Sequence, residues 1–127
     1  MPDKYTYEYA VIRWVPKVER EEFMNIGVIL FSKHKKLLSL QYHIDDKRLE
    51  NFDADVDIKE IQEYLEAWDL IAQGVKEGGE IACLDQASRF RWLTASKSTI
   101  IQCSKVHPGL HPNPEDVLKK LFERYVI

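Results

Sequence analysis

The sequence predicts a mainly antiparallel α+β fold, with a three-strand meander and a C-terminal hairpin packed against two amphipathic helices. Two patterns predict it. Three β-rich segments follow one another near the N-terminus, and apolar residues recur at helical spacing in two later segments. The composition agrees, because 45% hydrophobic and 31% charged residues are typical of a folded globular chain. A length of 127 residues is that of one domain, which we assign to residues 1–127.

Three segments are the predicted strands of the meander. Residues 5–15 are rich in aromatic and β-branched side chains up to Pro16, which cannot donate to a ladder. Residues 25–32 are apolar on both faces, as in a central strand, and Gly27 within them indicates a bulge or a close backbone approach. Residues 37–44 alternate between apolar and polar side chains, which predicts a strand with one solvated face.

Two amphipathic helices follow from periodicity and capping signals. Asp57 is the predicted N-cap of the first, and Gly74 or the later pair of glycines ends it. Its apolar residues recur at steps of three and four: Ile58, Ile61, Leu65, Trp68, Ile71 and Val75. Asn113 is the predicted cap of the last helix, with Pro114 in its first position. We expect that helix to bury Val117, Leu118, Leu121, Phe122, Tyr125 and Val126.

Residues 90–95 and 99–104 are predicted to form the C-terminal hairpin, joined by a Ser-Lys-Ser turn. On a strand, Arg89 and Arg91 point to the same side, while Phe90 points to the core. Two guanidinium groups on one side would suit a phosphate or a carboxylate, each of which accepts bidentate hydrogen bonds. The prolines and glycine that follow predict the end of regular structure.

The predicted functional surface combines the segment 89–107 with the turn 22–27. Core packing explains their apolar residues but leaves several polar side chains without a structural role. These are the candidate binding residues: Glu22, Asn25, Arg89, Arg91, Lys97, Ser98, Thr99 and His107. A second interpretation stays open, in which they are a solvated strand face, with Asn25 bonded to turn backbone and Glu22 paired with Arg89 or Arg91. The partner of the predicted surface is a protein or an anionic, phosphate-bearing ligand.

The remaining clusters predict no catalytic residue, cofactor or metal. Cys103, His107 and His111 have a spacing that suits zinc on a helix, but Pro108 and Pro112 forbid a helix there. A further cluster of acidic and basic residues is better explained as a solvated loop than as the converging carboxylates of a metal-dependent nuclease, because most of its acids lie in the charged connection 17–24. The cluster consists of Glu8, Arg13, Glu19, Arg20, Glu21, Glu22, Asp45 and Asp46. No phosphate-binding loop, dinucleotide turn or nucleophile elbow occurs.

Charge, cysteines and hydropathy bear on location and partners. A net charge of −3 excludes a generally basic nucleic-acid coat protein but permits a local basic patch. Two cysteines do not make a disulfide framework, and the N-terminus has no signal-peptide pattern. The longest apolar run, residues 26–31, is too short to span a bilayer. We therefore expect a cytoplasmic protein without a membrane partner.

Two long stretches, residues 7–31 and 89–126, resemble a bacterial family of uncharacterised proteins, domain-of-unknown-function family 3037. The resemblance rests on the motifs EFxNxGV from Glu22, RFxWLT from Arg89, Ser98-Thr99, and VHxGL from Val106. The family often has proline where this chain has Ser96. The resemblance implies no assigned activity, and it implies a gene neighbourhood with HipA-like kinases, hence a protein partner in a toxin–antitoxin-like context.

Two functions remain as alternatives. The first, which we favour, is a non-enzymatic binding or regulatory module that docks on a protein partner. The second is an enzyme that processes phosphate esters or nucleic acid, with the segment 89–107 as its site. The second requires His107, a carboxylate and the two arginines to converge in one concave site.

Overall fold

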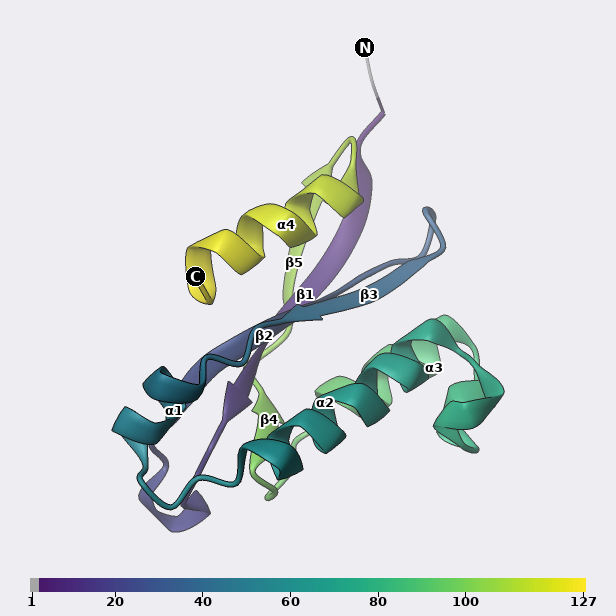
Figure 1. The fold of residues 1–127 in the computed structure, drawn as a ribbon. Coiled ribbons are helices and arrows are strands. Elements are labelled where there is room, and N and C mark those ends of the chain that lie inside the picture. Colours follow the sequence, from purple (N-terminus) through teal and green to yellow (C-terminus); the bar gives the residue numbers. More distant parts are fainter. Residues whose placement is uncertain (1–2) are drawn as a thin grey trace.

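The structure, a computed structural model, describes residues 3–127. There, a five-stranded antiparallel sheet has helices on both of its faces (Figure 1). The strands are β1 (Tyr5–Trp14), β2 (Met24–Ser32), β3 (Leu37–Tyr42), β4 (Ile101–Cys103) and β5 (His107–His111). The helices are α1 (Asp46–Phe52), α2 (Ile58–Gln73), α3 (Gln86–Thr94) and α4 (Pro114–Tyr125). The strand order is β3-β2-β1-β4, with β5 also paired to β1, and the predicted α+β fold class is confirmed.

The predicted meander is confirmed, with β2 as a buried central strand. Val28 and Ile29 are fully buried on its two faces. The pairing of β1 with β2 shifts register between Ile12 and Arg13, which is the bulge that Gly27 indicated. A Cβ atom at Gly27 would lie 2.8 Å from the carbonyl oxygen of Gln41, so close strand approach also requires glycine there.

Two separate cores form because β2 is apolar on both faces. On one face, Ile12, Ile29 and Phe31 pack with residues of α1, α2 and α3. On the other face, Val28 and Leu30 pack with α4 alone. The two predicted amphipathic helices therefore lie on opposite sides of the sheet and not in one layer (Figure 1).

Both predicted helices begin where their capping signals placed them, and α2 also ends at one of its two predicted stops. The carboxylate of Asp57 accepts a hydrogen bond from the Glu60 N–H at 3.1 Å, and α2 ends at Gly74, whose φ of 72° is left-handed. At α4, Asn113 occupies the N-cap position without a side-chain hydrogen bond, and Pro114 follows it. No helix within residues 3–127 combines the length and the apolar character that crossing a membrane requires.

The prediction of a first hairpin strand at residues 90–95 is wrong, because residues 86–94 form the helix α3. Asp85 caps it by accepting from the Ser88 N–H at 2.8 Å, and Phe90 and Leu93 lie one turn apart on its buried side. The stretch from Gln86 to Leu93 contains no β-branched residue, so its local preference favours a helix. Its aromatic residues suggested a strand, but Phe90 serves equally well as the buried residue of a helix.

The second predicted strand exists but pairs differently. β4 lies within the predicted range 99–104, and both it and β5 pair with β1 instead of with residues 90–95. Ser104 spans the break between them: its N–H donates to the Val11 carbonyl, and its hydroxyl accepts from the Val11 N–H, both at 2.8 Å. Regular structure thus continues through Pro108, and β5 is a strand at the sheet edge, where proline is tolerated.

Candidate functional site

The eight predicted binding residues do not form one surface, and Arg89 is the clearest case. Its side chain is only 8% exposed. Nη1 donates to the carbonyl oxygens of Ile71 (3.0 Å) and Ala72 (2.8 Å), and Nε donates to that of Leu84 (2.9 Å). Arg89 therefore satisfies carbonyl groups that the C-terminal end of α2 leaves without partners, which is a structural role.

Arg91 and His107 lie on opposite faces of the sheet. Arg91 makes a two-fold hydrogen-bonded ion pair with Glu8, and Arg91 lowers the pKa of this carboxyl mainly through those hydrogen bonds. The ring of His107 lies 5.3 Å from the ring of Tyr9, which packs on the α4 side. Because neighbouring strand residues point to opposite faces, Glu8 with Arg91 and Tyr9 with His107 are separated by the sheet.

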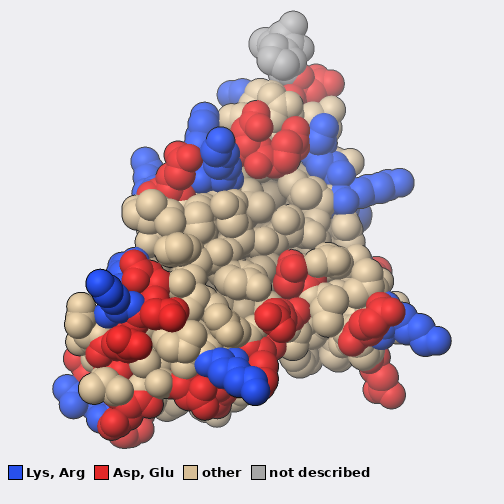
Figure 2. Space-filling model, in the orientation of Figure 1, with Lys and Arg blue, Asp and Glu red and all other residues tan. Residues whose placement is uncertain are grey.

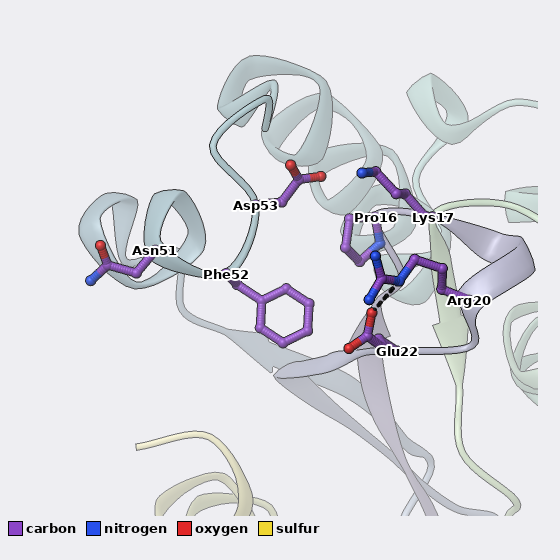
Figure 3. Close-up of a pocket in the computed structure, with 7 residues that line it drawn as sticks. All are labelled: Pro16, Lys17, Arg20, Glu22, Asn51, Phe52 and Asp53. Atoms are coloured by element: carbon purple, nitrogen blue, oxygen red, sulfur yellow. Dashed lines mark ion pairs between the residues drawn. The ribbon is translucent and has the colours of Figure 1, made fainter.

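The remaining predicted residues gather at the end of the sheet where the loop from Val15 to Phe23 joins β1 to β2. Three cavities of about 340, 290 and 370 Å³ open there. The first, drawn in Figure 3, shares Phe52 with the second, and the second shares Phe23 with the third. These cavities make up the loop-end surface, which contains Arg13, Lys17, Arg20, Glu21, Glu22, Phe23, Asn25, Arg48, Phe52, Asp53, Lys97, Ser98 and Gln102.

Two exposed phenylalanines mark the loop-end surface. Phe23 is 43% exposed and Phe52 is 41% exposed. The guanidinium carbon of Arg13 lies 4.0 Å from the centre of the Phe23 ring, and the Phe52 ring lies 5.7 Å from that of Trp14. In Figure 3 the Phe52 ring points toward Pro16 and the Arg20–Glu22 pair. Both rings are thus positioned by neighbours while a large part of each remains open to solvent.

The loop-end surface is more basic than the chain as a whole. Five basic and three acidic residues line its cavities, whereas the chain carries a net charge of −3. Glu22 pairs with Arg20 at 2.6 Å, so the alternative that it pairs with Arg89 or Arg91 is wrong. Arg13 has no ion pair within residues 3–127, and its buried Nε has no hydrogen-bond partner there. The guanidinium of Arg13 is therefore not neutralised by a carboxylate of the described chain, unlike that of Arg91.

Lys97 and its two neighbours contribute unequally. The ammonium of Lys97 donates to the carbonyls of Trp92, Leu93 and Ala95, which ends α3, and burial lowers the pKa of this amine. The hydroxyl of Thr99 donates to the Ile101 carbonyl at 3.0 Å. Ser98 is exposed and lines the largest of the three cavities. Ser98 and Thr99 are both exposed, but only Thr99 uses its hydroxyl in a hydrogen bond among the described residues.

Asn25 and Arg48 hold the C-terminal end of α4 against the sheet. The side-chain amide of Asn25 donates to the Tyr125 carbonyl at 3.2 Å, and Arg48 donates to the Val126 carbonyl at 3.0 Å. The other amide atom of Asn25, Oδ1, is buried without a partner among the described residues. Asn25 thus bonds to helix backbone and not to the turn, while it also lines the second cavity.

The cysteine and histidine residues considered for zinc lie in strands and not on one helix. Burial raises the pKa of the Cys103 thiol to about 12, which keeps it protonated and a poor nucleophile at neutral pH. His111 Nδ1 accepts a hydrogen bond from the Asn113 N–H at 2.8 Å. In residues 3–127 no three side chains of the metal-binding types His, Cys, Asp and Glu come together. That this chain binds no zinc stays a prediction.

Sequence reasoning missed three residues of the loop-end surface that carry most of its character. Core packing was expected to explain Phe23, but the structure leaves it 43% exposed. Arg13 was assigned to the solvated charged connection, although a lone arginine between Ile12 and Trp14 in a strand was a usable signal. Phe52 gave no signal, because an aromatic residue at a helix end is as often buried as exposed.

Comparison with known proteins identifies the family. The model of the family described as a protein of unknown function (DUF3037) matches residues 9–126, nearly the whole chain. The chain belongs to this family. No curated protein and no solved structure matches it.

Proposed function

We propose that this member of the DUF3037 family is a non-enzymatic binding module that docks a protein partner through its loop-end surface. The observation that carries the proposal is the pairing of exposed Phe23 and Phe52 with the unpaired guanidinium of Arg13. Exposed aromatic side chains beside arginine are the residue types that dominate binding energy at protein interfaces. The partner segment suited to this surface carries an apolar side chain next to a carboxylate or a phosphorylated side chain.

The alternative of an enzyme using the segment 89–107 receives no support from the arrangement of its residues. Arg89 is buried as a helix cap, and Arg91 is neutralised by Glu8. His107 is on the other side of the sheet, beside Tyr9. A general acid–base residue must lie within hydrogen-bond reach of the reacting group, together with the groups that stabilise charge. These residues do not meet that condition.

The finer proposal concerns the partner. The family resemblance favours a bacterial cytoplasmic setting and a HipA-like kinase as the partner, in a toxin–antitoxin-like context. The basic character of the loop-end surface supports a partner segment that is acidic or phosphorylated.

The experiment uses the tagged chain purified from its native host, with any protein that co-purifies in stoichiometric amount identified and then purified separately. Its affinity is measured by calorimetry for the wild type, for Phe23→Ala and for Arg13→Gln. We expect each variant to weaken binding by about tenfold or more, as truncation of an interface anchor does. Circular dichroism and thermal denaturation verify that each variant is folded.

Two matched controls test whether the effect belongs to this surface. Leu110→Ala removes another exposed apolar side chain, 62% exposed in β5, and Arg124→Gln removes an exposed arginine from α4. Both are expected to bind within about twofold of the wild type. Equal affinities for Phe23→Ala and Leu110→Ala would refute the proposed surface. A nucleotide or oligonucleotide that co-purifies instead of a protein would favour the enzyme.

A further inference from the structure

The two edges of the sheet differ in how well they are closed. β4 has three residues, and β5 contains Pro108, so that side of β1 offers only short, interrupted backbone. β3 forms the other edge with six residues that include no proline, glycine or charged residue. Its register with β2 is continuous from Tyr42 to Leu37. Proteins usually blunt such an edge with charge, proline or a bulge, and β3 has none of these.

The outer backbone groups of β3 can be assigned from its pairing with β2. The His43 N–H donates to the Ile26 carbonyl at 2.9 Å. In an antiparallel ladder the pattern alternates, so Gln41 and Ser39 also direct their N–H and C=O groups to β2. The same alternation directs the backbone groups of Leu38, Leu40 and Tyr42 outward. Within residues 3–127 no hydrogen bond is made to these outward groups.

The surface around β3 is uncharged along its length and charged at its ends. Figure 2 shows a band without charged side chains, flanked by charged side chains on both sides, at the level where Figure 1 has β3. Exposed Lys33, Lys35 and Lys36 lie in the turn before β3. Exposed Asp45 and Asp46 follow it, at the start of α1. One end of the edge is therefore basic and the other is acidic.

We propose that β3 pairs antiparallel with β3 of a second copy of this chain, so that the two sheets join across a two-fold axis. The three outward-facing residues fix the register: Leu40 pairs with its own counterpart, and Leu38 pairs with Tyr42 of the second copy. This register closes about six N–H···O=C hydrogen bonds, and any shift by two residues loses some of them.

The distribution of charge supports a second copy as the occupant. In the antiparallel arrangement the lysine turn of each copy meets the acidic end of the other, with Lys35 opposite Asp45 and next to Asp46. Both charge pairs form at once because the two-fold axis repeats the contact. A strand added in the parallel direction would bring the like-charged ends together, which costs binding energy.

A disulfide trap tests the register. Ser39 of one copy lies opposite Gln41 of the other in a pair without hydrogen bonds, where Cα atoms are about 4.5 Å apart and a disulfide fits. In a Cys83→Ser background, which removes the exposed native thiol, Ser39→Cys is mixed with Gln41→Cys under mild oxidation. We expect a disulfide-linked heterodimer of the two variants in high yield. Gln62→Cys mixed with Gln41→Cys is the control, and equal yields in the two mixtures would overturn the register.

Sedimentation velocity tests the dimer itself, with the wild type measured from low to high micromolar concentration. We expect a dimer that Ser39→Lys with Gln41→Lys dissociates, raising the dissociation constant about tenfold or more by placing lysines opposite each other. The control Gln62→Lys with Ala67→Lys adds the same charge on exposed positions of α2 and should leave the dimer unchanged. A wild type that stays monomeric throughout this range would overturn the proposal.

Charge reversal provides the most specific test of the antiparallel arrangement. Lys35→Glu and Asp45→Lys should each weaken the dimer, and the double variant should restore its affinity because it exchanges the two signs of the opposed pair. Circular dichroism verifies that each variant is folded, because Asp45 also caps α1. A double variant that dimerises no more tightly than the single variants would contradict the antiparallel arrangement. Phe23→Ala should leave the dimer unaffected, so failure of this proposal and failure of the loop-end surface are distinguishable.

Discussion

The C-terminal end of α2 and the loop-end surface each hold an arginine against the core, and the two arginines use their donors differently. Arg89 donates hydrogen bonds to three backbone carbonyls within the protein. Arg13 lies over the Phe23 ring, has no ion pair, and keeps a buried Nε without a partner in the described part of the chain. Residue type alone does not separate a structural arginine from a binding one. The two roles are separated by the acceptors that surround the guanidinium.

The end of α2 is built around its arginine. A Cβ atom at Gly74 would lie 2.6 Å from Nη1 of Arg89, so glycine is needed there both for its left-handed φ and for the space that the guanidinium fills. Nothing comparable closes around Arg13, which lines an open cavity of about 370 Å³. The first site is complete, whereas the second has room for a ligand.

The largest expected effect comes from removing the structural arginine. Arg89→Met should lower the free energy of unfolding by about 3 kcal/mol, because buried carbonyl groups lose their donors. Arg13→Met, the matched change at the loop-end surface, should lower it by less than about 1 kcal/mol, since no acceptor loses a partner. Urea denaturation of both variants measures the difference. Equal losses would show that the two arginines are not distinguished by their acceptors.

A double-mutant cycle tests the fit between Gly74 and Arg89. Gly74→Ala should cost about 2 kcal/mol, part from the left-handed backbone and part from crowding the guanidinium. In an Arg89→Met background the same change should cost only about 1 kcal/mol, the backbone part. A cost that does not depend on residue 89 would mean that the crowding is relieved by a shift of the side chain.

Two serines extend the comparison to hydroxyl groups. The Ser104 hydroxyl accepts from the Val11 N–H and donates to the Lys105 carbonyl, whereas Ser98 is exposed at the loop-end surface. Ser104→Ala should therefore cost about 1–2 kcal/mol, because it leaves a buried N–H unpaired. Ser98→Ala should be neutral for stability. Thermal denaturation decides, and a costly Ser98→Ala would assign that residue a structural role.

The smallest effect is expected at Arg91, whose ion pair with Glu8 is partly exposed to solvent. Arg91 depresses the folded-state pKa of Glu8, so the pair stabilises the fold above the unfolded pKa and loses this contribution as the pH falls through the folded value. Arg91→Gln should cost less than about 1 kcal/mol at pH 7, and this cost should shrink as the pH falls through the lowered pKa of Glu8. Unfolding measured from neutral to acidic pH checks both. A cost that does not change with pH would show that Arg91 acts through packing.

Local patterns predicted much of this fold from the amino-acid sequence. Alternating and two-sided apolar segments located β1, β2 and β3, and Asp57 and Gly74 placed both ends of α2. Helical spacing after Pro114 located α4. These features are set by residues within a few positions of one another, through side-chain period, backbone sterics and capping, so they can be read along the chain.

Contacts between distant segments decided the rest. Residues 86–94 carry both helix and strand signals. They form a helix in the structure, and as a helix they bury Phe90 and Leu93 in the core between the sheet and α2. Arg89 could be identified as a cap only once the carbonyls of Ile71 and Ala72 were known to lie beside it. The loop-end surface combines residues near positions 13–25, 48–53 and 97–102. Such a surface leaves no local pattern, because packing and not sequence spacing brings its side chains together.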